Sequence, residues 1–268
     1  MGRLPAIISS QQSMHLSFQK QPGNPTLGIA FFWKLTIETR SPVTLTDRFI
    51  PELFLDYFFV HKGNIQLSSP RGKKISLPQQ TLKTLHTHPV IMVFSTPLVL
   101  FGARLSLKFA ETYQPDAFPP NSLLEQQWIG KRTDDLNSFA VQITEFIQTY
   151  QIRKNPYPMF KSVLEESDWL VNFSPRHKRR LYKATFGLSR KELMNIQHIH
   201  SFLEQTCDFA SENPRIIQHV NPGVFYDQPH LNHTFKKMTG FSPVEYFEAQ
   251  SVLQDNLMSA SYNAVSGL

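Results

Sequence analysis

The hydrophobic periodicity of the chain changes near residue 134, and this change limits the folds that the chain can adopt. Before that point, short apolar or alternating runs are separated by turn residues, which is typical of an all-β sandwich or barrel. The predicted strands are Phe31–Ile37, Leu53–His61, Asn64–Ser68, Thr81–His86, Val90–Phe94 and Ala103–Phe109. Beyond it, apolar residues recur at spacings of three and four, which predicts helices. The sequence therefore indicates an α+β multidomain chain in which a β-barrel precedes an all-α region.

The predicted helices fall into two groups. The first is a single amphipathic helix, Leu136 to Tyr150, whose apolar face would either cover the barrel or pair with a second copy of the chain. The second group follows the break at Asn155-Pro156-Tyr157-Pro158 and continues to about residue 249. We therefore predict a first domain at residues 1–155 and a second at 156–249. Residues 250–268 show little periodicity, and we expect them to form a mobile tail.

Composition argues against membrane-spanning and disulfide-rich classes. The longest apolar stretch, Val90 to Ala103, is interrupted by polar residues and a proline, and it is shorter than the roughly 20 residues that a spanning helix needs. The apolar run at residues 4–8 is too short for a signal peptide. The single cysteine, Cys207, excludes an internal disulfide and a multi-cysteine zinc site. We expect a cytoplasmic protein that contacts no membrane.

Positive charge is concentrated in one part of the helical region. The chain carries 27 Lys and Arg against 21 Asp and Glu, for a formal charge of +6. Seven of the cations lie between residues 176 and 191 with no acid among them: Arg176, Lys178, Arg179, Arg180, Lys183, Arg190 and Lys191. A phosphate backbone is one natural partner for such a cluster. A solvated helix face is the alternative, and the cluster by itself does not decide between them.

Two segments of the helical region each predict a short helix, a turn and a second, capped helix. In the first segment, Ser174 caps a helix that begins with Pro175 and ends at Gly187. In the second, Asp227 caps a helix that ends at Gly240. Polar residues in the first two turns of such helices can reach base edges, as a helix-turn-helix requires.

A linking helix is predicted between these two segments, from Ser189 to Cys207. It would be about 28 Å long at about 1.5 Å per residue. This length is close to the roughly 34 Å between successive major grooves on one face of DNA. The spacing therefore favours two units that bind the same duplex.

Several motifs in the helical region are distinctive as sequences. They are Ser174-Pro175-Arg176-x-x-x-Arg180-x-Tyr182, Gly187-Leu188-Ser189, Phe225-Tyr226-Asp227-Gln228-x-His230-Leu231 and Phe235-Lys236-Lys237-x-Thr239-Gly240-Phe241-Ser242-Pro243-x-x-Tyr246. Through them, residues 156–247 resemble the paired helix-turn-helix domain of the AraC/XylS transcriptional regulators. More loosely, residues 48–52 and 102–105 make the N-terminal half similar to the cupin-like sensor domains found ahead of such regulators.

The resemblance implies a sequence-specific DNA-binding transcription regulator that is not an enzyme and needs no cofactor. Its partners would be double-stranded DNA, RNA polymerase and, at the cupin-like barrel, a small-molecule effector or a second copy of the chain. By position, the family's base-reading residues fall on Arg176, Arg179, Arg180, Gln228, Pro229, Asn232 and His233, and its phosphate contacts on Lys183, Lys236 and Lys237. The chain departs from the family pattern at Lys178, where a buried leucine is usual, and at Val220 and Val224, where small residues are usual.

Two alternatives to a DNA-binding regulator stay open from the sequence. One is a cupin-like small-molecule-binding protein whose helical domain has lost DNA binding, and the other is a protein-interaction module that uses the same helices. His86-x-His88 would place two imidazoles on one face of a strand, but no glutamate follows at Met92 or Val93, so we expect no metal there. The common hydrolase and nucleotide-binding motifs are absent from the sequence.

Overall fold

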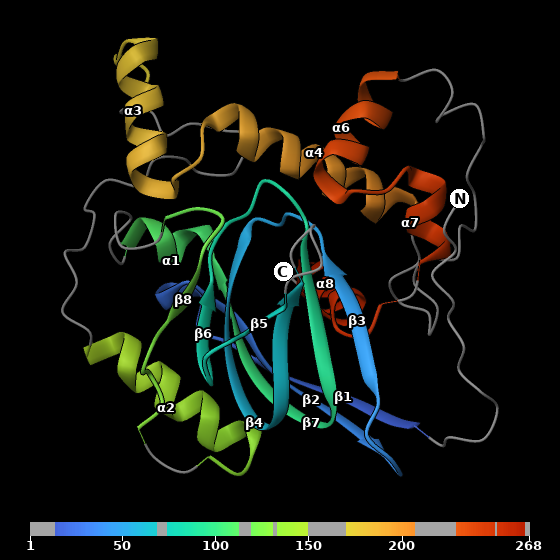
Figure 1. Ribbon diagram of the computed structural model, residues 1–268. Helices are drawn as coiled ribbons and strands as arrows, with labels where there is room; N and C mark the ends of the chain where they lie inside the picture. Colours follow the sequence, from blue (N-terminus) through green and yellow to red (C-terminus); the bar gives the residue numbers. More distant parts are fainter. Residues whose placement is uncertain are drawn as a thin grey trace.

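An antiparallel sheet with a group of helices at one end forms the architecture (Figure 1). The structure is a computed structural model, and it describes residues 14–68, 74–112, 119–130, 133–149, 170–206, 229–249 and 251–265. The strands are β1 (Met14–Pro22), β2 (Ile29–Thr39), β3 (Thr44–Phe49), β4 (Phe54–Ser68), β5 (Lys74–Ser76), β6 (Gln80–Lys83), β7 (Val90–Ser106) and β8 (Leu123–Glu125).

The sheet is open, so the prediction of a closed β-barrel is wrong. Its strand order is β1-β2-β7-β4-β6-β8, with β3 paired to β7 and β5 paired to β4. Within the described residues β1 pairs only with β2, and β8 pairs only with β6. A barrel requires a ladder between the two edge strands, and the described strands form none.

The two longest strands, β4 and β7, each unite two segments that the sequence separates. Gly63 lies within β4 at a shift in register, with a φ of 91° that favours glycine. Pro97 lies within β7 at the point where its partner changes from β3 to β2, so its missing N–H breaks no ladder. A Cβ atom on Gly63 would come within 2.7 Å of the Pro97 carbonyl oxygen. The two strands therefore depart from regular pairing side by side.

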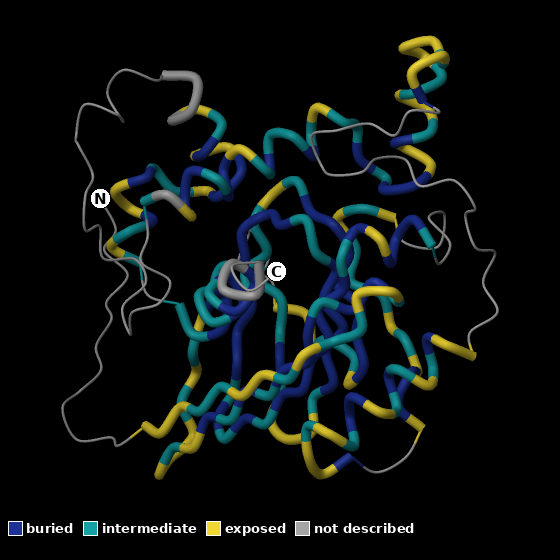
Figure 2. The backbone as a smooth tube through the Cα atoms, turned by 180° about the vertical axis from the view of Figure 1, so that it is seen from behind, coloured by how far each residue is buried: buried dark blue, intermediate teal, exposed yellow. Residues whose placement is uncertain are grey.

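Side chains on the two faces of the sheet belong to two apolar clusters. The period-two alternation of a strand sends Phe32 to one face and Trp33 to the other. The first cluster continues into the helical region, where it includes Tyr182 and Ile196. The sheet and the helices therefore share one apolar core, and Figure 2 shows the buried residues running through both.

The helices are α1 (Leu107–Thr112), α2 (Leu136–Thr149), α3 (Pro175–Phe186), α4 (Arg190–Thr206), α6 (Pro229–Thr239), α7 (Pro243–Glu248) and α8 (Gln254–Val265). Helix α2 confirms the predicted amphipathic helix, and Phe139, Ile143 and Ile147 on its apolar face are buried. Phe139 contacts the rings of Phe32 and Phe101 in the sheet. Because that face covers the chain's own sheet, it is not free to pair with a second copy. None of the helices in the described ranges is long and apolar enough to span a bilayer.

The C-terminal segment differs from the mobile tail that the sequence predicts. Residues 254–265 form α8, in which Leu257 and Met258 are fully buried. Leu253 and Leu257 pack in the second apolar cluster, together with Trp33 and Phe58 of the sheet. The buried positions recur at helical spacing, but Gln254, Ala260 and Ser261 are among them. Because these residues are polar or small, the apolar pattern in the sequence is weak there.

Candidate nucleic-acid interface

Helix α3 begins and ends where the sequence predicts. The Ser174 hydroxyl accepts a hydrogen bond from the N–H of His177 at 3.3 Å, and Pro175 occupies the first turn. Gly187 ends the helix with a φ of 68° and donates its N–H to the Lys183 carbonyl. Tyr182 is buried in the shared core, so the inner face of α3 is fixed.

The outer face of α3 carries exposed arginines. Arg176, Arg179 and Arg180 are all exposed, as the sequence predicts for residues that would enter a groove. The Nη2 atom of Arg180 donates to Nδ1 of His177 at 3.1 Å. The His177 ring in turn stacks on Phe173, with ring centroids 4.5 Å apart. His177 therefore holds Arg180 in place, a role that its position one turn before Arg180 could have suggested.

Lys183, predicted as a phosphate contact, already has a partner. Its ammonium lies 3.0 Å from Oε2 of Glu192 and donates to the Gly187 carbonyl at 3.2 Å. The same carboxylate accepts a hydrogen bond from the N–H of Ser189 at 2.7 Å and so caps the start of α4. Although burial favours the neutral acid, these hydrogen bonds from Ser189 and the Lys183 ammonium hold the pKa of Glu192 below its usual value.

In the second predicted unit, the structure describes fewer of the predicted DNA-binding side chains. His233, Lys236 and Lys237 are exposed on α6, whereas Phe235 is fully buried. The Phe235 ring meets Phe202 of α4 and Tyr246 of α7 edge to face, which fixes α6 between its neighbours. The remaining predicted residues of this unit lie outside the described part of the chain: Asp227 and Gln228 entirely, and Pro229 and Asn232 by their side chains.

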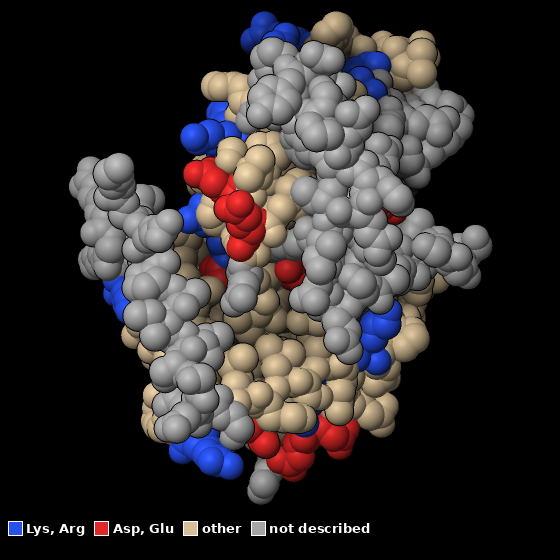
Figure 3. All heavy atoms as spheres, turned by 90° about the vertical axis from the view of Figure 1, so that its right-hand side faces the viewer, with Lys and Arg blue, Asp and Glu red and all other residues tan. Residues whose placement is uncertain are grey.

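The two candidate recognition helices share one orientation. Helix α4 has 17 residues, which corresponds to about 25 Å at about 1.5 Å per residue. Helices α3 and α6 stand at its two ends and project away from the sheet, with their N-terminal ends farthest from it (Figures 1 and 2). Seen from the side of α6 and α7, Lys and Arg side chains lie at the helical end of the molecule, and further ones lie at its opposite end beside Asp and Glu side chains (Figure 3).

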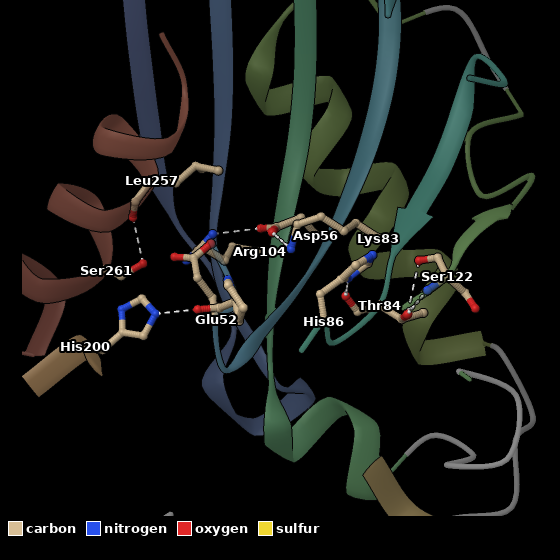
Figure 4. A network of polar contacts seen from close by, with 11 residues as sticks. Glu52, Asp56, Lys83, Thr84, His86, Arg104, Ser122, His200, Leu257 and Ser261 are labelled. Atoms are coloured by element: carbon tan, nitrogen blue, oxygen red, sulfur yellow. Dashed lines mark hydrogen bonds and ion pairs between the residues drawn. The ribbon is translucent and has the colours of Figure 1, made fainter. Parts of the chain in front are cut away.

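A buried charge network in the sheet was not predicted from the sequence. Arg104 is fully buried and binds Glu52 through Nη2 and Asp56 through Nη1, the latter at 3.0 Å. Lys83 lies 2.9 Å from the other oxygen of Asp56 (Figure 4). Burial alone would raise the pKa of Asp56, but Arg104 and Lys83 reverse this and lower it. The two carboxylates likewise raise the pKa of Arg104 against the effect of burial.

Two histidines beside this network are held as neutral side chains. His86 is buried, and its Nδ1 atom lies 2.6 Å from the Thr84 carbonyl, to which it donates. Burial lowers the pKa of His86 to about 3, and the nearby Lys83 ammonium contributes. Burial also lowers the pKa of His200, which reaches the network from α4. The described residues contain no group of three or more side chains that could hold a metal ion, so His86 and His88 lack further ligands there.

Comparisons with known proteins give weak similarities. No family model matches the chain, and no curated protein sequence matches it. A solved structure of ToxT from Vibrio cholerae shares 10% identity, covers 88% of this chain and 98% of its own, and has a TM-score of 0.38. A ToxT structure with unsaturated fatty acid bound shares 9%, covers 78% of this chain and 95% of its own, and has a TM-score of 0.36. Because TM-scores this low do not establish a shared fold, the function has to be inferred from the residues of this chain.

Proposed function

We propose that the chain is a sequence-specific DNA-binding transcription regulator. In this proposal, residues 156–249 bind two successive major-groove segments of one duplex, and residues 1–155 form a domain that senses an effector. The observation that carries it is the common orientation of α3 and α6, whose N-terminal ends project from the same side of α4 (Figure 1). A recognition helix contacts base edges with its N-terminal residues, so this is the end that has to be free.

The chemistry of the outer faces supports the same function. Arginine can donate two hydrogen bonds to guanine in the major groove, and three exposed arginines lie on α3. Exposed lysines, represented on α6 by Lys236 and Lys237, attract phosphate and release counterions from DNA. The remaining base-reading residues in this proposal are Gln228, Pro229, Asn232 and His233.

The test begins with selection of a binding sequence from a random duplex library by the full chain. The selected and a random duplex are then titrated at several salt concentrations. Arg180→Ala should lose about 1 to 3 kcal/mol of discrimination between them, because it removes a contact to a base. Lys236→Ala should weaken binding to both duplexes alike and reduce the salt dependence.

Arg40→Ala is the matched control, since Arg40 is an exposed arginine next to β2. It changes the net charge by the same amount as Arg180→Ala and should leave discrimination unchanged. Failure of the chain to enrich any sequence, or binding with no dependence on salt, would overturn the proposed function. Equal losses on both duplexes for Arg180→Ala would reassign that residue to phosphate contact.

A further inference from the structure

One short segment of the sheet region contacts both the second helical unit and helix α8, which follows that unit in the chain. It comprises residues 47–51, at the end of β3 and in the loop that follows. The Asp47 side chain is almost fully buried, and its Oδ2 atom accepts hydrogen bonds from the N–H groups of Val252, Leu253 and Gln254 at 3.1, 2.6 and 3.0 Å. Since these N–H groups open α8, Asp47 caps that helix from a strand about 200 residues earlier in the chain.

Arg48 contacts the turn between α6 and α7. Its guanidinium lies 3.7 Å from the centroid of the Phe241 ring, which is a close cation–π contact. Its Nη1 atom donates to the Gly240 carbonyl at 3.2 Å. Gly240 ends α6, so this contact fixes the base of the second recognition helix to β3.

A third contact joins the same segment to the linking helix. Nε2 of His200 in α4 lies 2.7 Å from the Pro51 carbonyl and donates to it, and both groups are buried. The next residue, Glu52, binds Arg104 within the sheet. The segment is therefore anchored in the sheet by a buried ion pair while it contacts α4, the α6–α7 turn and α8.

The first unit is fixed to the sheet region at a different place. A Cβ atom on Gly187 would lie 2.2 Å from Cδ of Pro120, so the end of α3 sits directly against the loop before β8. Both candidate recognition helices thus rest at their inner ends on the N-terminal half, while their N-terminal ends lie farther from the sheet (Figure 1).

We propose that the sheet is the base that fixes α3 and α6 relative to each other, and that Asp47 and Arg48 are the positioning residues at the α6 end. The inference rests on the proposed function and goes beyond it, because it makes binding to two grooves a property of the whole chain. His233, Lys236 and Lys237 of α6 are exposed, and Arg48 contacts the turn that ends this helix at Gly240 and Phe241. Fixing two modules in advance lowers the entropy lost when both engage one ligand.

The test uses the full chain and two forms of a duplex that it selects: one intact, and one in which the half contacted by α6 is scrambled. Arg48→Ala and Asp47→Ala should each weaken binding to the intact duplex by about tenfold, because the second contact becomes less well positioned. Binding to the scrambled duplex should change less than about twofold, since α3 alone contacts it. Arg40→Ala is the control for the positive charge that Arg48→Ala removes, and it should change binding to both duplexes equally.

Hydrogen exchange provides a readout that does not depend on DNA. In Asp47→Ala, the amides of residues 252–254 should exchange faster while those of β2 and β7 keep their protection. If Asp47→Ala fails to fold, Asp47→Asn retains one acceptor oxygen and should show a smaller change in the same direction. Tighter binding by either variant, or equal weakening on both duplexes, would overturn the inference. Failure of the unaltered chain to select any duplex would overturn the proposed function, and the inference with it.

Discussion

The sheet and helix α3 use arginine in opposite ways. Arg104 in the sheet has no exposed surface and contacts a carboxylate on each side. Arg176, Arg179 and Arg180 on α3 are exposed, and the sequence of that helix contains no acid. The same guanidinium is therefore a structural group in one region and a group presented to solvent in the other.

The physical reason for the difference is the cost of removing a charge from water. A buried ion loses several kcal/mol of hydration, which only close and complete pairing offsets. An exposed arginine keeps its hydration until a ligand replaces it, and a phosphate or a guanine edge can do so at little cost. Loss of Arg104 should therefore destabilise the sheet. Loss of an arginine on α3 should leave the fold intact and weaken binding of the ligand.

The largest expected effect comes from Arg104→Met, which conserves much of the side-chain volume. It leaves Glu52 and Asp56 buried with Lys83 as the one remaining cation of the described network. We expect the free energy of unfolding to fall by about 3 to 5 kcal/mol, the usual result of breaking a buried pair. Urea denaturation measures it. Arg180→Met is the matched control and should change stability by less than about 0.5 kcal/mol. Similar losses of stability in the two variants would contradict the difference between the buried and the exposed arginines.

A smaller effect should appear as a dependence of stability on pH. The pKa of His86 is about 3 in the folded chain, against about 6.5 when unfolded. Between these values the unfolded state binds the extra proton, so stability falls as the pH falls. We expect a loss of about 2 kcal/mol between pH 7 and pH 5 from this residue.

His86→Gln should remove most of that pH dependence in urea titrations. Burial also lowers the pKa of His200, so this residue contributes in the same direction. Stability of a His86→Gln/His200→Gln double variant should therefore depend even less on pH. His233→Gln, at an exposed position, is the control. An unchanged slope in the double variant would show that other groups cause the acid sensitivity.

Removal of the cap of α3 should lower stability by less than either of these changes. Ser174→Ala leaves the N–H of His177 without its acceptor and should cost about 1 kcal/mol of stability. Ser174→Asn supplies another acceptor at the same place and should restore most of the loss. Stability in urea measures both variants. If Ser174→Ala is as stable as the unaltered chain, packing against the shared core, and not the cap, determines where α3 begins.

Local features of the chain could be predicted from the sequence, and long-range ones could not. Ser174, Gly187 and the arginine face of α3 depend on residues three or four apart, so periodicity and capping rules locate them. The open edge of the sheet depends on which strands pair, and single-strand patterns do not contain that information. Within β7, Pro97 resembled a strand end because a proline normally interrupts a ladder.

The candidate site divides in the same way. The exposed residues of α3 were predicted, but the contacts that hold α6 on the sheet were not. Asp47 reaches α8, and Arg48 reaches Phe241 across nearly 200 residues of sequence. Arg104, Glu52 and Asp56 form a network whose members are ordinary strand residues when each is considered alone.

The smallest effect concerns two lysines that the sequence assigns to the same role. Lys183 lies 3.0 Å from Glu192, with 53% and 40% of the two side chains exposed, so this pair should contribute less than about 1 kcal/mol to stability. Under the proposed function the pair matters for DNA binding, because Glu192 already neutralises much of the charge that Lys183 would offer to a phosphate. For Lys237, the described residues show no such ion pair.

Lys237→Ala and Lys183→Ala remove the same charge, so their difference isolates the effect of Glu192. Lys237→Ala should reduce the slope of log affinity against log salt by about 0.9, the value for one phosphate contact on duplex DNA. Lys183→Ala should reduce it by less than half as much, since binding there first requires the ion pair to open. Glu192→Gln should bring the Lys183 contribution up to that of Lys237. If Lys183→Ala and Lys237→Ala give equal slopes in the unaltered Glu192 background, the pair opens freely on DNA, and exposure alone decides which cations of this chain contact phosphate.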